Sequence, residues 1–142
     1  MFFKKIKQVS YQDIQRFANI YGFPYDDNLI DMFHGINGGI PVGFSFLYGN
    51  ENTELVQDSI KRILSFNPED SYSMEENVDA VDCTGNHIPF AMDEEENYIC
   101  FCTENGEEKI KIFILDTEEF YDIYTEQGEI YTPNMFFSDL GC

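Results

Sequence analysis

The sequence predicts an α+β fold, with N-terminal helices, a twisted antiparallel β-sheet meander and a short C-terminal helix. Three observations predict it. Apolar residues recur at helical spacing in the first 40 positions, turn signals and alternating apolar residues dominate after them, and a Thr-Pro pair starts a last helical segment. At 142 residues, the chain is expected to form one domain spanning 1–142.

The first helix is expected to begin after Ser10 and to end at Gly22. Ser10 is a typical N-cap, and Asp13 stands where a capping box places its acidic partner. Glycine tolerates the left-handed conformation that ends many helices. Between these positions the apolar residues at helical spacing are Ile14, Phe17, Ala18 and Tyr21.

A second helix is expected after the turn at Pro24, with Asp26 or Asp27 as its cap. Its apolar residues Leu29, Phe33 and Ile36 recur at helical spacing. The Asn-Gly-Gly run at 37–39 should end it, and the following Pro41 prevents its continuation.

The middle of the chain turns towards strands. Phe44, Phe46 and Tyr48 alternate as in a half-buried strand. Residues 55–66 are ambiguous, because the apolar residues of this segment also fit helical spacing. A short helix is plausible over 71–78.

Asn105-Gly106 is a strong hairpin signal, because a type I′ turn needs positive φ at both central residues. This turn sets a register in which opposed residue numbers sum to 211. Ile99 then faces Ile112 on a core side, and Cys100 faces Lys111 on an outer side. Four further pairs follow: Phe101 with Ile110, Tyr98 with Phe113, Cys102 with Lys109, and Glu104 with Glu107, a like-charge pair at the tip.

The last helix is expected to start at Thr132-Pro133, an N-cap followed by proline at the first helical position. Met135, Phe136 and Leu140 provide its apolar side, and Gly141 follows them.

Negative charge is concentrated in the second half of the chain. The whole sequence carries a net charge of −19, and residues 63–142 account for −18 of it, with 20 acids against Lys109 and Lys111. Such a surface repels nucleic acids and anionic lipids but attracts basic proteins. The charge therefore predicts a basic protein partner, with simple solubility as the alternative.

Three segments in order resemble the SUKH superfamily. "FPYDDNLIDMFHGINGGIP" at 23–41 is similar to its turn, helix and Asn-Gly-Gly-x-Pro end. "IPFAMDEEENYICF" at 88–101 and "IKIFILD" at 110–116 are similar to two of its strands. The sequence departs from the family at Glu94–Glu96, where a glycine-containing turn is usual, in lacking the later tryptophan, and in its short last helix.

The resemblance implies a non-catalytic binding protein. Most bacterial members look like immunity proteins that neutralise a cognate polymorphic toxin, often a nuclease, by binding its C-terminal toxin domain. The alternative is an intracellular interaction module like the fungal Smi/Knr-like regulators. The resemblance also implies a strand over 59–66.

The partner-binding residues are expected among the acids and tyrosines of the second half. For the acidic run the alternative interpretation is a solvated turn, and for the tyrosines it is ordinary sheet packing. The candidates are Asp93, Glu94, Glu95, Glu96, Tyr98, Glu104, Glu107, Tyr121, Asp122 and Tyr124.

Other chemistry finds little support. The sequence contains none of the common nucleotide-binding, hydrolase or zinc-protease motifs. Cys83 and His87 with Cys100 and Cys102 do not have the spacing of a common zinc site, and the acidic run at 93–96 lacks the alternation of a calcium loop. Asn86 and His87 near Asp82 support an enzyme only by residue type. We therefore expect no catalytic site, cofactor or metal, and a cytoplasmic protein that does not contact membranes; the oligomeric state is left open.

Overall fold

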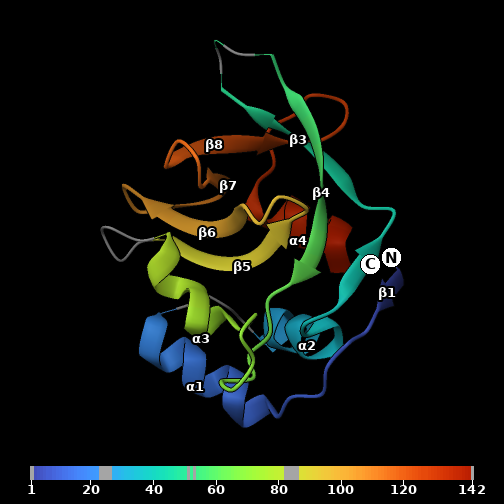
Figure 1. Ribbon diagram of the computed structural model, residues 1–142, viewed down its shortest axis with the longest axis vertical. Helices are drawn as coiled ribbons and strands as arrows, with labels where there is room; N and C mark the ends of the chain where they lie inside the picture. Colours follow the sequence, from blue (N-terminus) through green and yellow to red (C-terminus); the bar gives the residue numbers. More distant parts are fainter. Residues whose placement is uncertain (1, 23–26, 51, 53, 82–86, 142) are drawn as a thin grey trace.

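A closed six-stranded antiparallel β-barrel forms the body of the molecule in the computed structural model (Figure 1). The structure describes residues 2–22, 27–50, 52, 54–81 and 87–141. Each strand of the barrel pairs with its neighbours along the chain, and the last strand pairs with the first. The strands are β3 (Ser45–Gly49), β4 (Val56–Ile63), β5 (His87–Asp93), β6 (Tyr98–Glu104), β7 (Glu107–Ile114) and β8 (Glu119–Tyr124).

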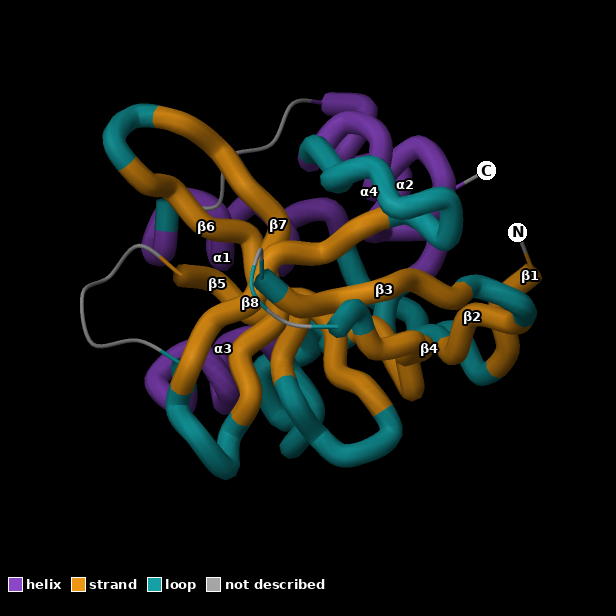
Figure 2. Tube along the Cα trace, turned by 90° about the horizontal axis from the view of Figure 1, so that it is seen from above, coloured by secondary structure: helices purple, strands orange, loops and turns teal. Residues whose placement is uncertain are grey.

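Short helices cover the barrel at its sides and base (Figures 1 and 2). Helix α4 packs against β7 and α2, α1 packs against α2, and α3 packs against β5. A small separate sheet pairs β1 with β2. The elements are β1 (Phe2–Lys4), α1 (Tyr11–Tyr21), α2 (Asp27–Ile36), β2 (Ile40–Val42), α3 (Met74–Asn77), a 3₁₀ turn (Val78–Ala80) and α4 (Pro133–Gly141).

The expected fold class was wrong: the protein is mostly β, and its sheet closes into a barrel. β8 pairs with β3 as well as with β7, in a register that sets Leu47 opposite Tyr124 and Tyr48 opposite Ile123. Turn signals predict the pairing of neighbouring strands only. The contact that closes a barrel joins segments about 75 residues apart, which local patterns do not report.

Both ends of α1, the end of α2 and the start of α4 are confirmed, but Asp27, offered as a cap, is the first residue of α2, and Gly141, expected beyond the last helix, is the last residue of α4. The Ser10 hydroxyl accepts a hydrogen bond from the Asp13 N–H at 3.1 Å, and Gly22 ends α1 with φ 69°. Helix α2 ends at Ile36, immediately before the Asn-Gly-Gly run. At α4, the Thr132 hydroxyl accepts from the Met135 N–H at 3.2 Å. The proposed turn at Pro24 and a cap at Asp26 lie outside the described residues.

Most of the ambiguous segment is a strand, Val56–Ile63, which overlaps the strand implied over 59–66 but starts earlier and ends at Ile63; the helical spacing within it has a physical origin. The register of β4 against β5 shifts between Ile60 and Arg62, which marks a β-bulge. A bulge adds one residue to the alternation. Buried residues Ile60 and Ile63 are therefore three positions apart, as they would be in a helix. The helix expected over 71–78 is confirmed as α3 with Ser73 as its N-cap.

The β6–β7 hairpin has the predicted register throughout, and Asn105 and Gly106 both have positive φ. The expectation of an outer, half-polar face was wrong. Cys100 and Cys102 are fully buried, and so are Ile99 and Phe101 on the opposite face. Strand β6 is covered on both sides because the barrel closes around one face while helices and neighbouring side chains cover the other.

Aromatic side chains from the helices fill the space beside the strands. The Phe136 ring contacts Phe44, Phe46 and Phe90, and the Phe137 ring stacks on Phe101. No helix among the described residues is long and apolar enough to cross a membrane.

Candidate binding site

Antiparallel order brings three chain connections to one end of the barrel. Successive strands run in opposite directions, so the β3–β4, β5–β6 and β7–β8 connections all lie at the same end. Contacts support this grouping. The Leu115 N–H after β7 donates to the Asn97 Oδ1 before β6 at 3.0 Å. Residues Glu54 and Thr117, from the first and third connections, line one pocket.

Carboxylates gather at this end, which we call the acidic barrel end. Seven exposed acids belong to it, distributed over all three connections. Lys61 Nζ lies 4.0 Å from Glu96, a distance at which an exposed pair contributes little. The acidic barrel end comprises Glu54, Glu94, Glu95, Glu96, Asp116, Glu118 and Glu119.

Asp93 begins the acidic run but is not part of its exposed surface. It is only 2% exposed, and three N–H groups donate to its carboxylate: those of Glu95 at 3.0 Å and Asn97 at 2.8 Å, and the Asn97 side-chain amide at 3.0 Å. These hydrogen bonds fold the turn and turn Glu94 to Glu96 outward. The run therefore combines one structural carboxylate with three solvent-facing ones.

A second carboxyl group, Asp58 on β4, lies beside Asp93 inside the barrel. The Ser59 N–H donates to its Oδ1 at 2.8 Å, whereas Oδ2 is buried and receives no N–H from the described residues. Burial, followed by a hydrogen bond with Asp93, raises the pKa of Asp58 to about 8. Burial beside a second carboxyl group therefore favours the protonated form of Asp58 at neutral pH.

A pocket of about 210 Å³ opens at the acidic barrel end. Its walls are mainly apolar, and the Tyr48 and Tyr121 rings lie with their centroids 6.1 Å apart. Burial, followed by the charges of Asp58, Asp93 and Glu95, raises the pKa of the Tyr48 hydroxyl. The pocket is lined by Tyr48, Gly49, Glu54, Val56, Ile114, Thr117 and Tyr121.

Glu104 and Glu107 do not join this surface. They form the tip of the β6–β7 hairpin, which projects from the body of the molecule (Figure 2), at the opposite end of β6 from the acidic run. Six residue steps along a strand separate these ends by roughly 20 Å. The two groups of acids proposed as one partner-facing surface therefore lie at opposite ends of the barrel.

Lysines neutralise part of the hairpin tip. Lys111 Nζ lies 3.0 Å from Glu104 and 3.7 Å from Asp122, and Lys109 lies 3.5 Å from Glu104. The hydrogen bond from Lys111 lowers the pKa of Glu104. Burial acts against the charge of Lys111, but its hydrogen bond to Glu104 and the charge of Asp122 leave its pKa raised. The like-charge pair expected at the tip is thus relieved by bases within the hairpin, while Glu107 stays exposed.

The three candidate tyrosines occupy different environments. Tyr98 is 8% exposed, and its hydroxyl donates to Asn77 Oδ1 at 2.7 Å, so it packs against α3. Tyr121 lines the pocket, and its hydroxyl donates to Glu119 at 2.7 Å. Tyr124 is half-buried and, like Asp122, points to the other face of β8 from Tyr121. Among the three, Tyr121 lines the pocket of the acidic barrel end.

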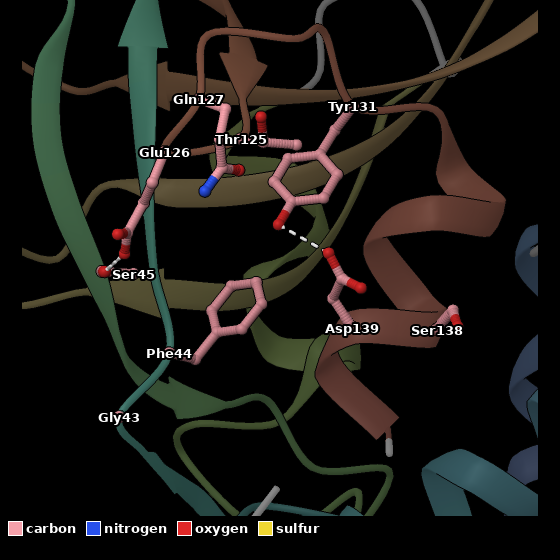
Figure 3. A pocket seen from close by; sticks show the side chains of 9 residues that line it. All are labelled: Gly43, Phe44, Ser45, Thr125, Glu126, Gln127, Tyr131, Ser138 and Asp139. Atoms are coloured by element: carbon pink, nitrogen blue, oxygen red, sulfur yellow. Dashed lines mark hydrogen bonds between the residues drawn. The ribbon is translucent and has the colours of Figure 1, made fainter.

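A larger, polar pocket of about 470 Å³ lies at the opposite end, between the start of β3, the segment after β8, and α4 (Figure 3). The Ser45 hydroxyl donates to Glu126, and the Tyr131 hydroxyl donates to Asp139 at 2.9 Å. Burial and this hydrogen bond raise the pKa of Tyr131. Each hydroxyl is held by a carboxylate, and together they connect the barrel to the loop and helix beside it.

The cysteines and histidines of the described region do not form a reactive cluster. Burial raises the pKa of Cys102 to about 12 and that of Cys100 well above its ordinary value, which keeps both as unreactive thiols. His34 stacks on Tyr11, and His87 stacks on Phe120. Within the described residues, no three His, Cys, Asp or Glu side chains are grouped to hold a metal. Cys83, Asp82 and Asn86 lie outside those residues.

Sequence reasoning missed Tyr48, Glu54, Val56, Asp58 and Ile114 as members of this site. A usable signal was present: in a meander, connections one hairpin apart lie at the same end, so the acids at 94–96 and 116–119 belong together. No such signal pointed to Asp58 or Glu54, because the sequence left residues 55–66 open between a strand and a helix, and with them the connection before β4.

Comparison of the chain with protein-family models, curated proteins and solved structures finds no significant match.

Proposed function

We propose that this is a non-catalytic binding protein whose acidic barrel end recognises a basic protein partner. The observation that carries the proposal is the grouping of seven exposed carboxylates at the barrel end that holds this pocket. Among the ion pairs of the described residues, only that of Lys61 with Glu96, at 4.0 Å, involves one of these carboxylates. Carboxylates that lack bases of their own speed the encounter with a basic surface and stabilise the complex electrostatically.

The cellular role that we propose is the neutralisation of a cognate toxin, whose basic C-terminal domain is the binding partner. This role rests on the resemblance to immunity proteins of the SUKH superfamily, while the barrel end supplies the means of binding. A nuclease domain presents a basic groove to nucleic acid, and an acidic protein that occupies or flanks this groove blocks it without chemistry of its own. A Smi/Knr-like interaction module would use the same acidic surface on a different partner.

Co-expression tests the cellular role. The C-terminal domain of the protein encoded immediately upstream is expressed in a susceptible host with and without this chain. We expect growth arrest without the chain and growth with it. Arrest in both cultures would contradict the toxin role, and a chain that binds a basic partner without protecting the host would favour the interaction module.

Charge reversal tests the binding surface. Replacing Glu94, Glu95 and Glu96 with lysine should slow association with that domain roughly tenfold or more. Added salt should slow association of the wild type similarly, because exposed charges are screened over about 8 Å. The matched control carries lysines at Glu107, Glu108 and Glu129, three exposed acids away from this end. A larger effect of the control would move the binding surface to the other end of the barrel.

A further inference from the structure

The pocket of the acidic barrel end has the size of one long side chain. Its volume is about 210 Å³. Pockets for small molecules and cofactors usually hold about 300–1,000 Å³. The dimensions therefore favour a single side chain of a larger partner over a free organic ligand.

The walls of this pocket suit an aliphatic stem. Val56 and Ile114 contribute apolar surface from β4 and β7, and the rings of Tyr48 and Tyr121 contribute aromatic surface from β3 and β8. Val56 is 48% exposed, although it is an aliphatic residue in a strand. Exposed apolar surface at the rim of a charged pocket is a common feature of binding sites.

The charges around the pocket require the other end of that side chain to be cationic. Glu54 lines the pocket, and Glu119 accepts the hydrogen bond of the Tyr121 hydroxyl at its edge. The charges of Asp93 and Glu95 also act on the Tyr48 hydroxyl. A cation within about 6 Å of a tyrosine ring is also attracted by the ring itself. An anionic side chain is repelled by these carboxylates, and a neutral polar one lacks both the attraction between opposite charges and that of a cation to the rings.

We infer that this pocket receives one lysine or arginine side chain of the basic partner. Lysine and arginine combine a long apolar stem with a charged head, which matches apolar walls beneath a carboxylate rim. The inference rests on the proposed function and adds to it a buried anchor, which governs how long a complex lasts, while the outer carboxylates govern how fast it forms.

A peptide series tests the chemistry of the pocket without the partner. Capped pentapeptides with a central lysine, arginine, norleucine or glutamate, otherwise glycine and serine, are titrated into the isotope-labelled chain. We expect the lysine and arginine peptides to shift the amide signals of Gly49, Val56 and Thr117 saturably, with a Kd on the order of millimolar, as suits a single anchor. Equal binding of norleucine, or saturable shifts confined to other regions, would overturn the inference.

A tethered cation tests the same pocket from within. Val56→Arg places a guanidinium at the rim, where it competes with the peptide and with the partner. Val42→Arg is the matched control, since Val42 is 43% exposed on β2, away from the pocket, and the change in net charge is identical. We expect Val56→Arg to abolish the lysine-dependent shifts and Val42→Arg to preserve them.

The variants Val56→Arg and Val42→Arg also distinguish this inference from the proposed function. In binding to the toxin domain, Val56→Arg should speed dissociation at least tenfold more than Val42→Arg does. Equal effects of the two variants would overturn the anchor, while the salt dependence and the charge-reversal result would still support the acidic surface. Thermal unfolding of both variants confirms that each is folded before binding is compared.

Discussion

Asp58 and Asp93 bring two carboxyl groups together on adjacent strands at the acidic barrel end, and burial beside Asp93 raises the pKa of Asp58 to about 8. Three N–H groups hold the Asp93 carboxylate, while Asp58 has one N–H donor and a buried oxygen. The charged groups that act on Asp58 are Asp93 and Glu95, and both favour its protonated form.

Asp58→Asn should therefore remove a pH dependence of stability. The pKa of Asp58 is about 8 in the folded chain and 3.8 ordinarily, so between these values the folded state holds a proton that the unfolded state has lost. Its contribution makes the free energy of unfolding fall as pH rises through this window. We expect the variant to gain stability over the wild type progressively from pH 5 to pH 8, by roughly 1–3 kcal/mol at the upper end.

Urea unfolding at pH 5, 6.5 and 8 measures this difference. Asp116→Asn, an exposed exchange at the same end, is the control for the loss of one negative charge. Parallel curves for wild type and Asp58→Asn would show that Asp58 does not hold the proton.

Glu96→Gly should stabilise the β5–β6 turn. Glu96 has φ 64°, a left-handed conformation that costs a non-glycine residue roughly 1–2 kcal/mol, while a glycine costs about 0.5–1 kcal/mol in chain entropy. The balance favours glycine by roughly 0.5 kcal/mol. Glu95→Gly removes the same charge, but Glu95 is not among the positive-φ residues of the described chain. This control exchange should therefore destabilise the protein. Thermal denaturation of both variants decides, and an equal change in Tm would argue against backbone strain.

Phe101→Ala should cost about 3–5 kcal/mol. The ring is 2% exposed and stacks on Phe137 with their centroids 6.2 Å apart, so its removal leaves a cavity between β6 and α4. Leu115→Ala, at a position 40% exposed, should change the free energy of unfolding by less than about 0.5 kcal/mol. A loss below 1 kcal/mol for Phe101→Ala in chemical denaturation would place that ring outside the core.

Asn37→Ala should cost about 2–4 kcal/mol, because Asn37 is fully buried and connects three segments. Its amide donates to the Lys7 carbonyl at 3.0 Å and to Asn67 Oδ1 at 2.8 Å, and its oxygen accepts from the Phe66 N–H at 2.8 Å. Exposed Asn28→Ala in α2 is the control. Hydrogen exchange should show faster opening around Lys7 and Phe66 in the variant, and unchanged rates there would contradict this connecting role.

Local signals in the sequence predicted local structure well. Ser10, Gly22 and Asn105-Gly106 each impose a backbone conformation through their own chemistry, and each stands where it was expected. The hairpin register followed from the turn alone. The segment 56–63 could not be assigned from spacing, because a bulge produced the period of a helix.

Properties that depend on distant parts of the chain could not be predicted in the same way. Burial of Cys100 and Cys102 depends on what covers the second face of β6, and a lysine opposite each suggested solvent. Lys111 keeps its charge there by pairing with Glu104 and Asp122. The acidic run likewise divides into buried Asp93 and exposed Glu94–Glu96 only once the turn is folded.

Closure of the barrel through β3 and β8 has a consequence for synthesis. β3 leaves the ribosome about 75 residues before its partner, so one edge of the nascent sheet stays unpaired until residues 119–124 have emerged. At roughly 5–20 residues per second this interval lasts about 4–15 seconds. Until then Phe44 and Phe46 also lack Phe136, which arrives later still. Chains shortened before β8 should therefore associate with chaperones, and full-length chains should be released from them.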